Sequence, residues 1–277
     1  MITINNNMYV LDTDNTSYVF AVLGSGQLEH LYYGRKLHAN EAVMTEKHTF
    51  IPGNTNVYNK DYSSYSLEDV CLEMSSLGKG DIREPFIEVT YPNGSSTTDM
   101  VFDRAEIIQG KEEYDTLPGS YDDNGEVEQL VIYLKDRNYN LTLELHYYVY
   151  EKCDIITRSA KLVNSGNESV RLERLMSMQL DLNESDYELS FFNGAWAREM
   201  NRSRISLRAG KYVNESVTGT SSNRANPFFM IGRSSTTEDY GECYGFNLIY
   251  SGNHYEAAQG FLQVFVTDRI MHWSIIF

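Results

Sequence analysis

Residues 194 to 199 read Gly-Ala-Trp-Ala-Arg-Glu, and their types and spacing could recognise a sugar. Trp196 follows a turn signal, Asn193-Gly194, and precedes the charged residues Arg198 and Glu199. A sugar has one face of C–H groups and a polar rim, so an indole beside hydrogen-bonding charges suits it. The alternative is a tryptophan that caps the edge of a sandwich core, and the residue types alone leave both interpretations open.

His254 is a second candidate, because it lies in Ser-Gly-Asn-His-Tyr-Glu beside turn residues, although a structural role is the alternative. The six histidines show no HxH or HExxH spacing and the three cysteines form no CxxC pair, so we expect no metal site. No GxSxG motif indicates a nucleophile, and no pair of acids stands out as a catalytic carboxylate pair. We therefore expect neither a catalytic residue nor a cofactor in this chain.

The charge of the chain restricts its partners. Its 277 residues include 39 acidic and 23 basic ones, which gives a net charge of −16. This balance opposes binding to nucleic acid and to anionic membranes, and it permits a neutral ligand. The N-terminus resembles no signal peptide, and no stretch approaches the ~20 apolar residues of a membrane span. A reducing cytoplasm is the expected location.

The hydrophobic pattern predicts strands. In residues 141–149, Leu-Thr-Leu-Glu-Leu-His-Tyr-Tyr-Val, apolar residues alternate with polar ones. The alternation of residues 170–182 changes phase between Leu172 and Met176, which predicts a bulge. Turn residues at 164–167 and at 92–94 predict two hairpins. Many short strands and no clean helical stripe predict a large all-β sandwich.

Two segments depart from this pattern. Residues 46–80 form the longest segment without clear alternation, and such segments are usually functional or mobile. Residues 259–277 are an atypical, strongly apolar tail. The tail is either a final core strand or the mark of a truncated longer protein. No linker divides the chain, so we expect residues 1–277 to form one domain.

The sequence resembles the N-terminal domain of bacterial α-galactosidases of glycoside hydrolase family 36. The resemblance covers most of residues 20–258, and the motifs that carry it follow the order and spacing of the family. These motifs are LEHLYYGRKL (28–37), SLEDVCLEMSSLGKGDIREPFIEV (66–89), TLPGSY (116–121), FFNGAWAREMNR (191–202), GTSSNRANPFF (219–229) and YGECYGFNLIYSGNHYEAA (240–258).

The resemblance implies a fold and a site. The implied fold is a β-supersandwich of two extended antiparallel sheets with few or no helices. In the family a (β/α)₈ barrel follows and carries both catalytic aspartates of a retaining hydrolase; this chain contains no such barrel. Many members are tetramers, in which one N-terminal domain helps to close a neighbour's active site. Trp196, Arg198 and Glu199 would then border the galactoside site, and the segment with Asn54 could reach it, although the acid of some members is absent there.

Three functions follow as hypotheses. The first is a non-catalytic domain of an α-galactosidase that contributes to oligomer assembly and to the rim of the sugar site. The second is a free-standing galactoside-binding module, and the third is a purely structural assembly domain. The expected substrate-binding residues are Trp196, Arg198, Glu199, Asn54 and His254.

Overall fold

The computed structural model describes residues 1–38, 58, 60–62, 66–183, 186–260 and 270–276. The chain divides into two compact units, residues 1–115 with 120–180 and residues 116–119 with 181–277. Strands dominate both units, and the described helices are three short 3-10 turns, Lys60–Tyr62, Leu67–Asp69 and Glu151–Cys153. The predicted all-β, antiparallel class is confirmed. None of these turns has the length or the apolar character to cross a membrane.

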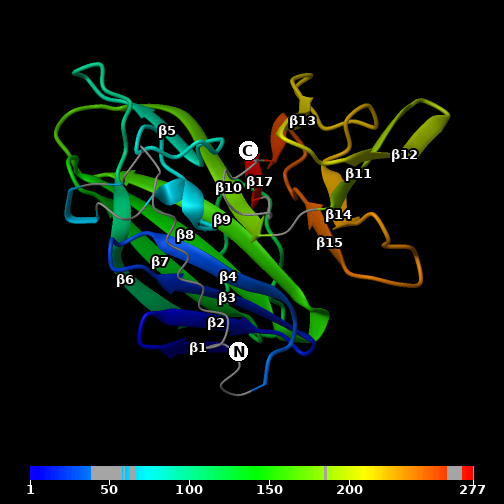
Figure 1. Ribbon diagram of the computed structural model, residues 1–277, viewed down its shortest axis with the longest axis horizontal. Coiled ribbons are helices and arrows are strands. Elements are labelled where there is room, and N and C mark those ends of the chain that lie inside the picture. The colour runs from blue at the N-terminus through cyan, green and yellow to red at the C-terminus, as the bar shows by residue number, and fades with distance from the viewer. Residues whose placement is uncertain (39–57, 59, 63–65, 184–185, 261–269, 277) are drawn as a thin grey trace. The chain divides into compact units, whose positions relative to one another are not determined.

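Unit 1 is built from antiparallel sheets (Figure 1). The first has the order β1-β2-β3-β4, formed by β1 (Ile2–Asn5), β2 (Met8–Asp12), β3 (Thr16–Val22) and β4 (Leu28–Arg35). The second has the order β6-β7-β8-β9, formed by β6 (Met100–Gln109), β7 (Glu128–Asp136), β8 (Leu141–Tyr150) and β9 (Ile155–Asn164). In addition, β5 (Ile87–Thr90) pairs with β10 (Arg171–Asn183), whose last residues enter unit 2.

Aromatic rings join the first two sheets of unit 1. Phe20 on β3 stacks on Tyr147 of β8 with ring centroids 5.3 Å apart, and it also stacks on Tyr9 of β2 at 5.0 Å. Phe20 and Tyr147 have no exposed surface. Such pairs contribute about 0.5–1.5 kcal/mol beyond the area they bury, so this contact holds the centre of the sandwich.

Unit 2 contains a four-stranded sheet of order β12-β11-β14-β15. Its strands are β11 (Tyr187–Ala195), β12 (Arg198–Ser206), β14 (Phe228–Arg233) and β15 (Cys243–Asn247). In the same unit β16 (His254–Gly260) pairs with β13 (Gly210–Ser216) on one side and β17 (Ile270–Ile276) on the other. Phe191 of β11 packs against Tyr212 of β13, with centroids 4.9 Å apart, so the two groups of strands share a core.

Several local predictions are confirmed. The five apolar residues of the alternating run on β8 are buried, although His146 and Tyr148 on the other face are buried as well. The pairing of β10 with β5 shifts register between Leu172 and Arg174, which is the predicted bulge. The apolar tail contains a strand, since β17 pairs with β16.

The two predicted hairpins are wrong. Residues 164–167 connect β9 to β10, but β9 pairs with β8 whereas β10 pairs with β5. Residues 92–94 form a tight turn, in which the Gly94 amide donates to the Tyr91 carbonyl at 2.9 Å. That turn connects β5 to β6, which belong to different sheets. Turn residues reverse the chain in both places, but they do not determine which strand the next one will pair with.

Candidate functional site

The motif Gly-Ala-Trp-Ala-Arg-Glu forms the tip of the β11–β12 hairpin in unit 2. The strands pair regularly up to Asn193, and the register then shifts before Ala195 pairs with Arg198. At Gly194 an added Cβ would collide with the Arg198 carbonyl oxygen and with Glu199 Cα. Only glycine permits this close backbone approach, so Gly194 sets the shape of the tip.

The tip holds its own conformation. Ala197 and Met200 have positive φ angles, 60° and 55°. The Ala197 amide donates a hydrogen bond to Glu199 Oε1 at 2.8 Å, and Asn201 Nδ2 donates one to the Arg198 carbonyl at 2.6 Å. Left-handed backbone at residues other than glycine is strained and persists where the surroundings enforce it.

This conformation presents Trp196 to solvent. The residue is 91% exposed, so it does not cap the core in this chain. The Arg198 side chain is also exposed and has no hydrogen-bond or ion-pair partner among the residues that the structure describes. Trp196, Arg198 and Glu199 thus lie together on one tip, with an aromatic face, a free cation and a carboxylate available to a ligand.

His254 lies elsewhere in unit 2, at the start of β16 opposite Ser216 of β13. It is 3% exposed, and neither ring nitrogen has a hydrogen-bond partner within the described part of the chain. Burial lowers the pKa of this imidazole, and Glu215 opposes that shift. No contact of the described residues connects His254 to the hairpin tip. Asn54, the fifth expected residue, lies outside the described residues.

Glu256 is two residues further along β16, and sequence reasoning missed it. It is 3% exposed and accepts a hydrogen bond from Asn214 Nδ2 at 2.7 Å. Its other carboxyl oxygen, Oε1, has no partner among the described residues. Burial raises the pKa of Glu256 to about 7. Unit 2 therefore buries a carboxyl group whose environment favours the protonated form.

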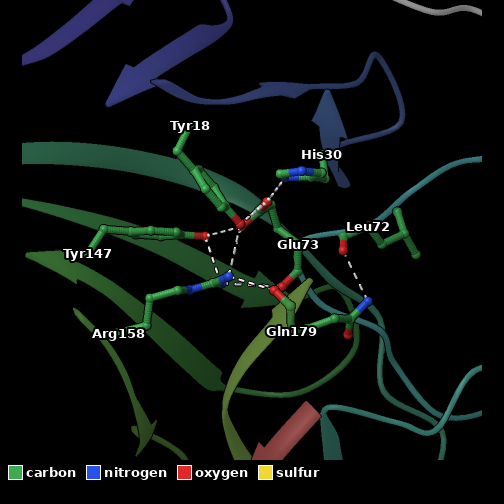
Figure 2. Close-up of polar contacts among 7 residues, drawn as sticks. All are labelled: Tyr18, His30, Leu72, Glu73, Tyr147, Arg158 and Gln179. Carbon is green, nitrogen blue, oxygen red and sulfur yellow. Dashed lines mark hydrogen bonds and ion pairs between the residues drawn. The ribbon is translucent and has the colours of Figure 1, made fainter. Parts of the chain in front are cut away.

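Unit 1 buries a different carboxylate in a dense network (Figure 2). Glu73 accepts hydrogen bonds from the hydroxyls of Tyr18 at 2.6 Å and Tyr147 at 2.7 Å. His30 Nδ1 lies 2.7 Å from Glu73 Oε1, and Arg158 Nη1 lies 3.2 Å from Oε2. The Arg158 guanidinium also lies over the Tyr147 ring, 4.4 Å from its centroid.

Electrostatics fixes the charges in this network. Burial alone would raise the pKa of Glu73, but Arg158 and the hydrogen bond with His30 outweigh it and hold that pKa below its usual value. Burial raises the pKa of the Tyr18 and Tyr147 hydroxyls, so both remain protonated donors. Glu73 is thus a paired interior charge whose two carboxylate oxygens both accept hydrogen bonds.

The network connects elements that are far apart in the sequence. Arg158 on β9 donates to the Gln179 carbonyl on β10 at 2.6 Å, and Gln179 Nε2 donates to the Leu72 carbonyl at 3.1 Å. Glu73 thereby ties the irregular segment around residue 72 to strands β3, β4, β8 and β9. A single acid inside the apolar run Val-Cys-Leu-Glu-Met was the signal available in the sequence. The network is closed to ligands and serves as a scaffold.

Among the described residues, no group of three or more His, Cys, Asp or Glu side chains could hold a metal ion.

A family model and full-length relatives of known function both match this chain and give the same family. Residues 26–263 match the family model described as glycosyl hydrolase family 36 N-terminal domain. The chain is 36% identical over 249 residues to α-galactosidase AgaA of Geobacillus stearothermophilus. This match covers 88% of this chain and 33% of that protein. It is 34% identical to the bifunctional α-galactosidase/sucrose kinase AgaSK of Mediterraneibacter gnavus, with 90% of this chain and 27% of that protein covered.

Solved structures of α-galactosidases share the fold of this chain over nearly its whole length. The crystal structure of α-galactosidase AgaB from Geobacillus stearothermophilus superposes with a TM-score of 0.91 at 30% identity, covering 99% of this chain and 37% of that one. A variant of AgaA solved in complex with raffinose gives a TM-score of 0.88 at 31% identity, covering 97% of this chain and 37% of that one. The chain thus spans about a third of the length of the relatives that it matches.

Proposed function

We propose a function from one premise: the chain belongs to the glycosyl hydrolase family 36 N-terminal domain family. The proposed function is that of the non-catalytic N-terminal domain of an α-galactosidase, which hydrolyses terminal α-galactosides with retention of configuration. The domain contributes to oligomer assembly and to the rim of the sugar site, in the cytoplasm. By itself the chain is expected to hydrolyse nothing, because the family's catalytic aspartates lie in the barrel.

The exposed hairpin tip carries this proposal. Trp196 is 91% exposed on a tip whose backbone is held in a strained, hydrogen-bonded form. A tryptophan that is 91% exposed contributes little to a core, and strained backbone at residues other than glycine clusters at binding and active sites. We assign Trp196 the role of an aromatic wall for the galactoside, and Arg198 and Glu199 the role of hydrogen-bonding groups. His254 and Asn54 remain proposed substrate contacts with no support from the described contacts.

A test uses the complete polypeptide, obtained by reading the coding sequence beyond Phe277, with Trp196→Ala and the matched control Trp196→Phe. We expect Trp196→Ala to raise KM for raffinose about 3- to 10-fold, the loss of one aromatic contact, while Trp196→Phe keeps most of the affinity. An unchanged KM in the alanine variant would remove Trp196 from the sugar site. The mass of the complete protein in solution tests the assembly role, which requires an oligomer.

The two alternatives make other predictions. A free-standing module requires that this chain alone binds galactose in a manner that Trp196→Ala abolishes. A purely structural domain requires a stable oligomer whose mass and stability do not respond to sugar. A site completed by another domain instead predicts almost no Trp196-dependent affinity in the chain alone, because part of its contacts is missing.

A further inference from the structure

A groove lies on the outer face of the four-stranded sheet of unit 2, away from the hairpin tip. Residues alternate across a strand, so while Leu189 of β11 points into the core, Ser190 points outward. Ser190 is flanked by its register partners, Arg204 on β12 and Met230 on β14. Together with the turn that contains Thr236 and the neighbouring residues, these side chains line a groove of about 430 Å³. That volume lies within the ~300–1,000 Å³ range of small-ligand sites.

The far wall of the groove is held in place by one side chain. Arg204 Nη2 donates to the carbonyl oxygens of Arg233 at 3.1 Å, Ser234 at 3.2 Å and Thr236 at 3.4 Å. Thr236 Oγ1 in turn donates to the Glu242 carbonyl at 3.0 Å. A turn held by this many hydrogen bonds needs little ordering when a ligand binds, and such preorganisation favours affinity.

The two cations of the groove are already paired. Arg204 forms an ion pair with Glu188, and Arg202 lies 3.9 Å from Glu238. The Asp239 carboxylate has no partner among the described residues. An anion would therefore meet no uncompensated cation. A neutral ligand would meet donors and acceptors of both kinds.

The floor of the groove presents both polar and apolar surface. The Ser190 hydroxyl has no hydrogen-bond partner within the described part of the chain, and Met230 beside it offers an apolar thioether surface. A hydroxyl beside an apolar patch, with no unpaired cation around them, matches a molecule that has many hydroxyls and one C–H face.

We propose that this groove is a second binding site, which takes a short neutral oligosaccharide independently of the hairpin tip. Its walls are Arg202 and the turn fixed by Arg204, and its floor is Ser190 with Met230. The site lies wholly within unit 2, so the chain alone is sufficient for it.

The experiment titrates the 277-residue chain with raffinose and follows it by calorimetry and ligand-observed NMR. Ser190→Trp fills the floor and should raise Kd at least tenfold, while Arg202→Ala should raise it about 3- to 10-fold through loss of a charged donor. Trp196→Ala should leave Kd within about twofold, which separates this site from the proposed hairpin site. Circular dichroism checks that each variant folds. If Ser190→Trp does not fold, the Kd of Arg202→Ala alone tests the proposed site.

Two results would overturn the proposal. The first is the absence of raffinose binding to the chain. The second is raffinose binding that Trp196→Ala abolishes and that Arg202→Ala leaves unchanged. Neither of these results bears on whether Trp196 acts in the complete enzyme.

Discussion

Each unit buries a glutamate, and the two carboxyl groups behave in opposite ways. Glu73 in unit 1 has no exposed surface and lies beside Arg158, which holds its pKa below the usual value. Glu256 in unit 2 is almost as deeply buried, but its hydrogen bond comes from the neutral amide of Asn214, and burial raises its pKa to about 7. Burial alone therefore does not determine the charge of a carboxyl group; its partner does.

The same contrast distinguishes the exposed groups. Unit 1 places an arginine, a glutamate and two tyrosines where no ligand can reach them, and they organise the sandwich. Unit 2 places Trp196 and the unpaired Arg198 on a hairpin tip in solvent. Interior charges thus specify the scaffold in one unit, while in the other the Arg198 cation on the hairpin tip remains free for binding.

Removing the cation of unit 1 should have the largest effect. Arg158→Met leaves Glu73 buried without its countercharge, and breaking a buried pair in this way costs about 3–5 kcal/mol of unfolding free energy. The matched control is Arg171→Met, which breaks an exposed pair with Glu173 at 3.0 Å. It should cost less than about 0.5 kcal/mol. Equal losses in urea unfolding would contradict the scaffold role of the network.

Glu256 should make unit 2 sensitive to pH. Its folded-state pKa of about 7 lies above the ordinary 4.5, so the folded protein prefers the protonated form. This preference stabilises the fold fully below pH 4.5, and its contribution falls as pH rises to about 7. The difference between pH 5 and pH 8 should amount to about 2–3 kcal/mol.

Glu256→Gln provides the comparison, because glutamine resembles the protonated acid and keeps an oxygen for Asn214. Hydrogen exchange of the β16 amides should lose its pH-dependent stability component in this variant. A wild-type protein and a glutamine variant with the same pH dependence would show that Glu256 ionises freely in the folded state.

Gly194→Ala should disturb the hairpin tip. The added Cβ collides with the Arg198 carbonyl oxygen, and overpacking of this kind costs about 1–3 kcal/mol. Gly245→Ala on β15 of the same sheet is the control, since its Cβ would meet nothing closer than 3.8 Å. Thermal unfolding should separate the two variants, and a Gly194→Ala protein as stable as the control would mean that the tip is not conformationally restricted.

Trp196→Ala should have the smallest effect on stability. A side chain that is 91% exposed loses almost no packing, so the free energy of unfolding should change by less than about 0.5 kcal/mol. Phe229→Ala, a buried ring on β14, should cost about 3–5 kcal/mol in the same assay. A large loss in Trp196→Ala would mean that the tryptophan supports the fold rather than a ligand.

Local features could be predicted from the sequence, because they depend on neighbouring residues. The alternation on β8, the bulge after Leu172 and the turn at Trp196 all follow from periodicity and turn chemistry. The resemblance to glycoside hydrolase family 36 additionally implied a β-supersandwich fold and a sugar-binding role for the hairpin tip.

Long-range pairing could not be predicted. The Glu73 network joins residues 18, 30, 73, 147 and 158, and no local pattern links these positions. For the same reason the turn at 164–167 gave no sign that β10 pairs with β5. Glu256 stood among 39 acidic residues, and what distinguishes it is burial beside the neutral amide of Asn214 rather than beside a cation.

The accessibility of Trp196 tests the central claim most directly. Trp196 is one of two tryptophans in the 277-residue chain, so the fluorescence that disappears in Trp196→Phe, measured in the chain and in the complete protein, isolates the acrylamide quenching of this residue. If the hairpin tip borders the sugar site, quenching of Trp196 should be rapid in the chain alone and strongly reduced in the complete protein once a galactoside is bound. Equal quenching in the chain, the complete protein and its galactoside complex would contradict a role for the hairpin tip in the sugar site.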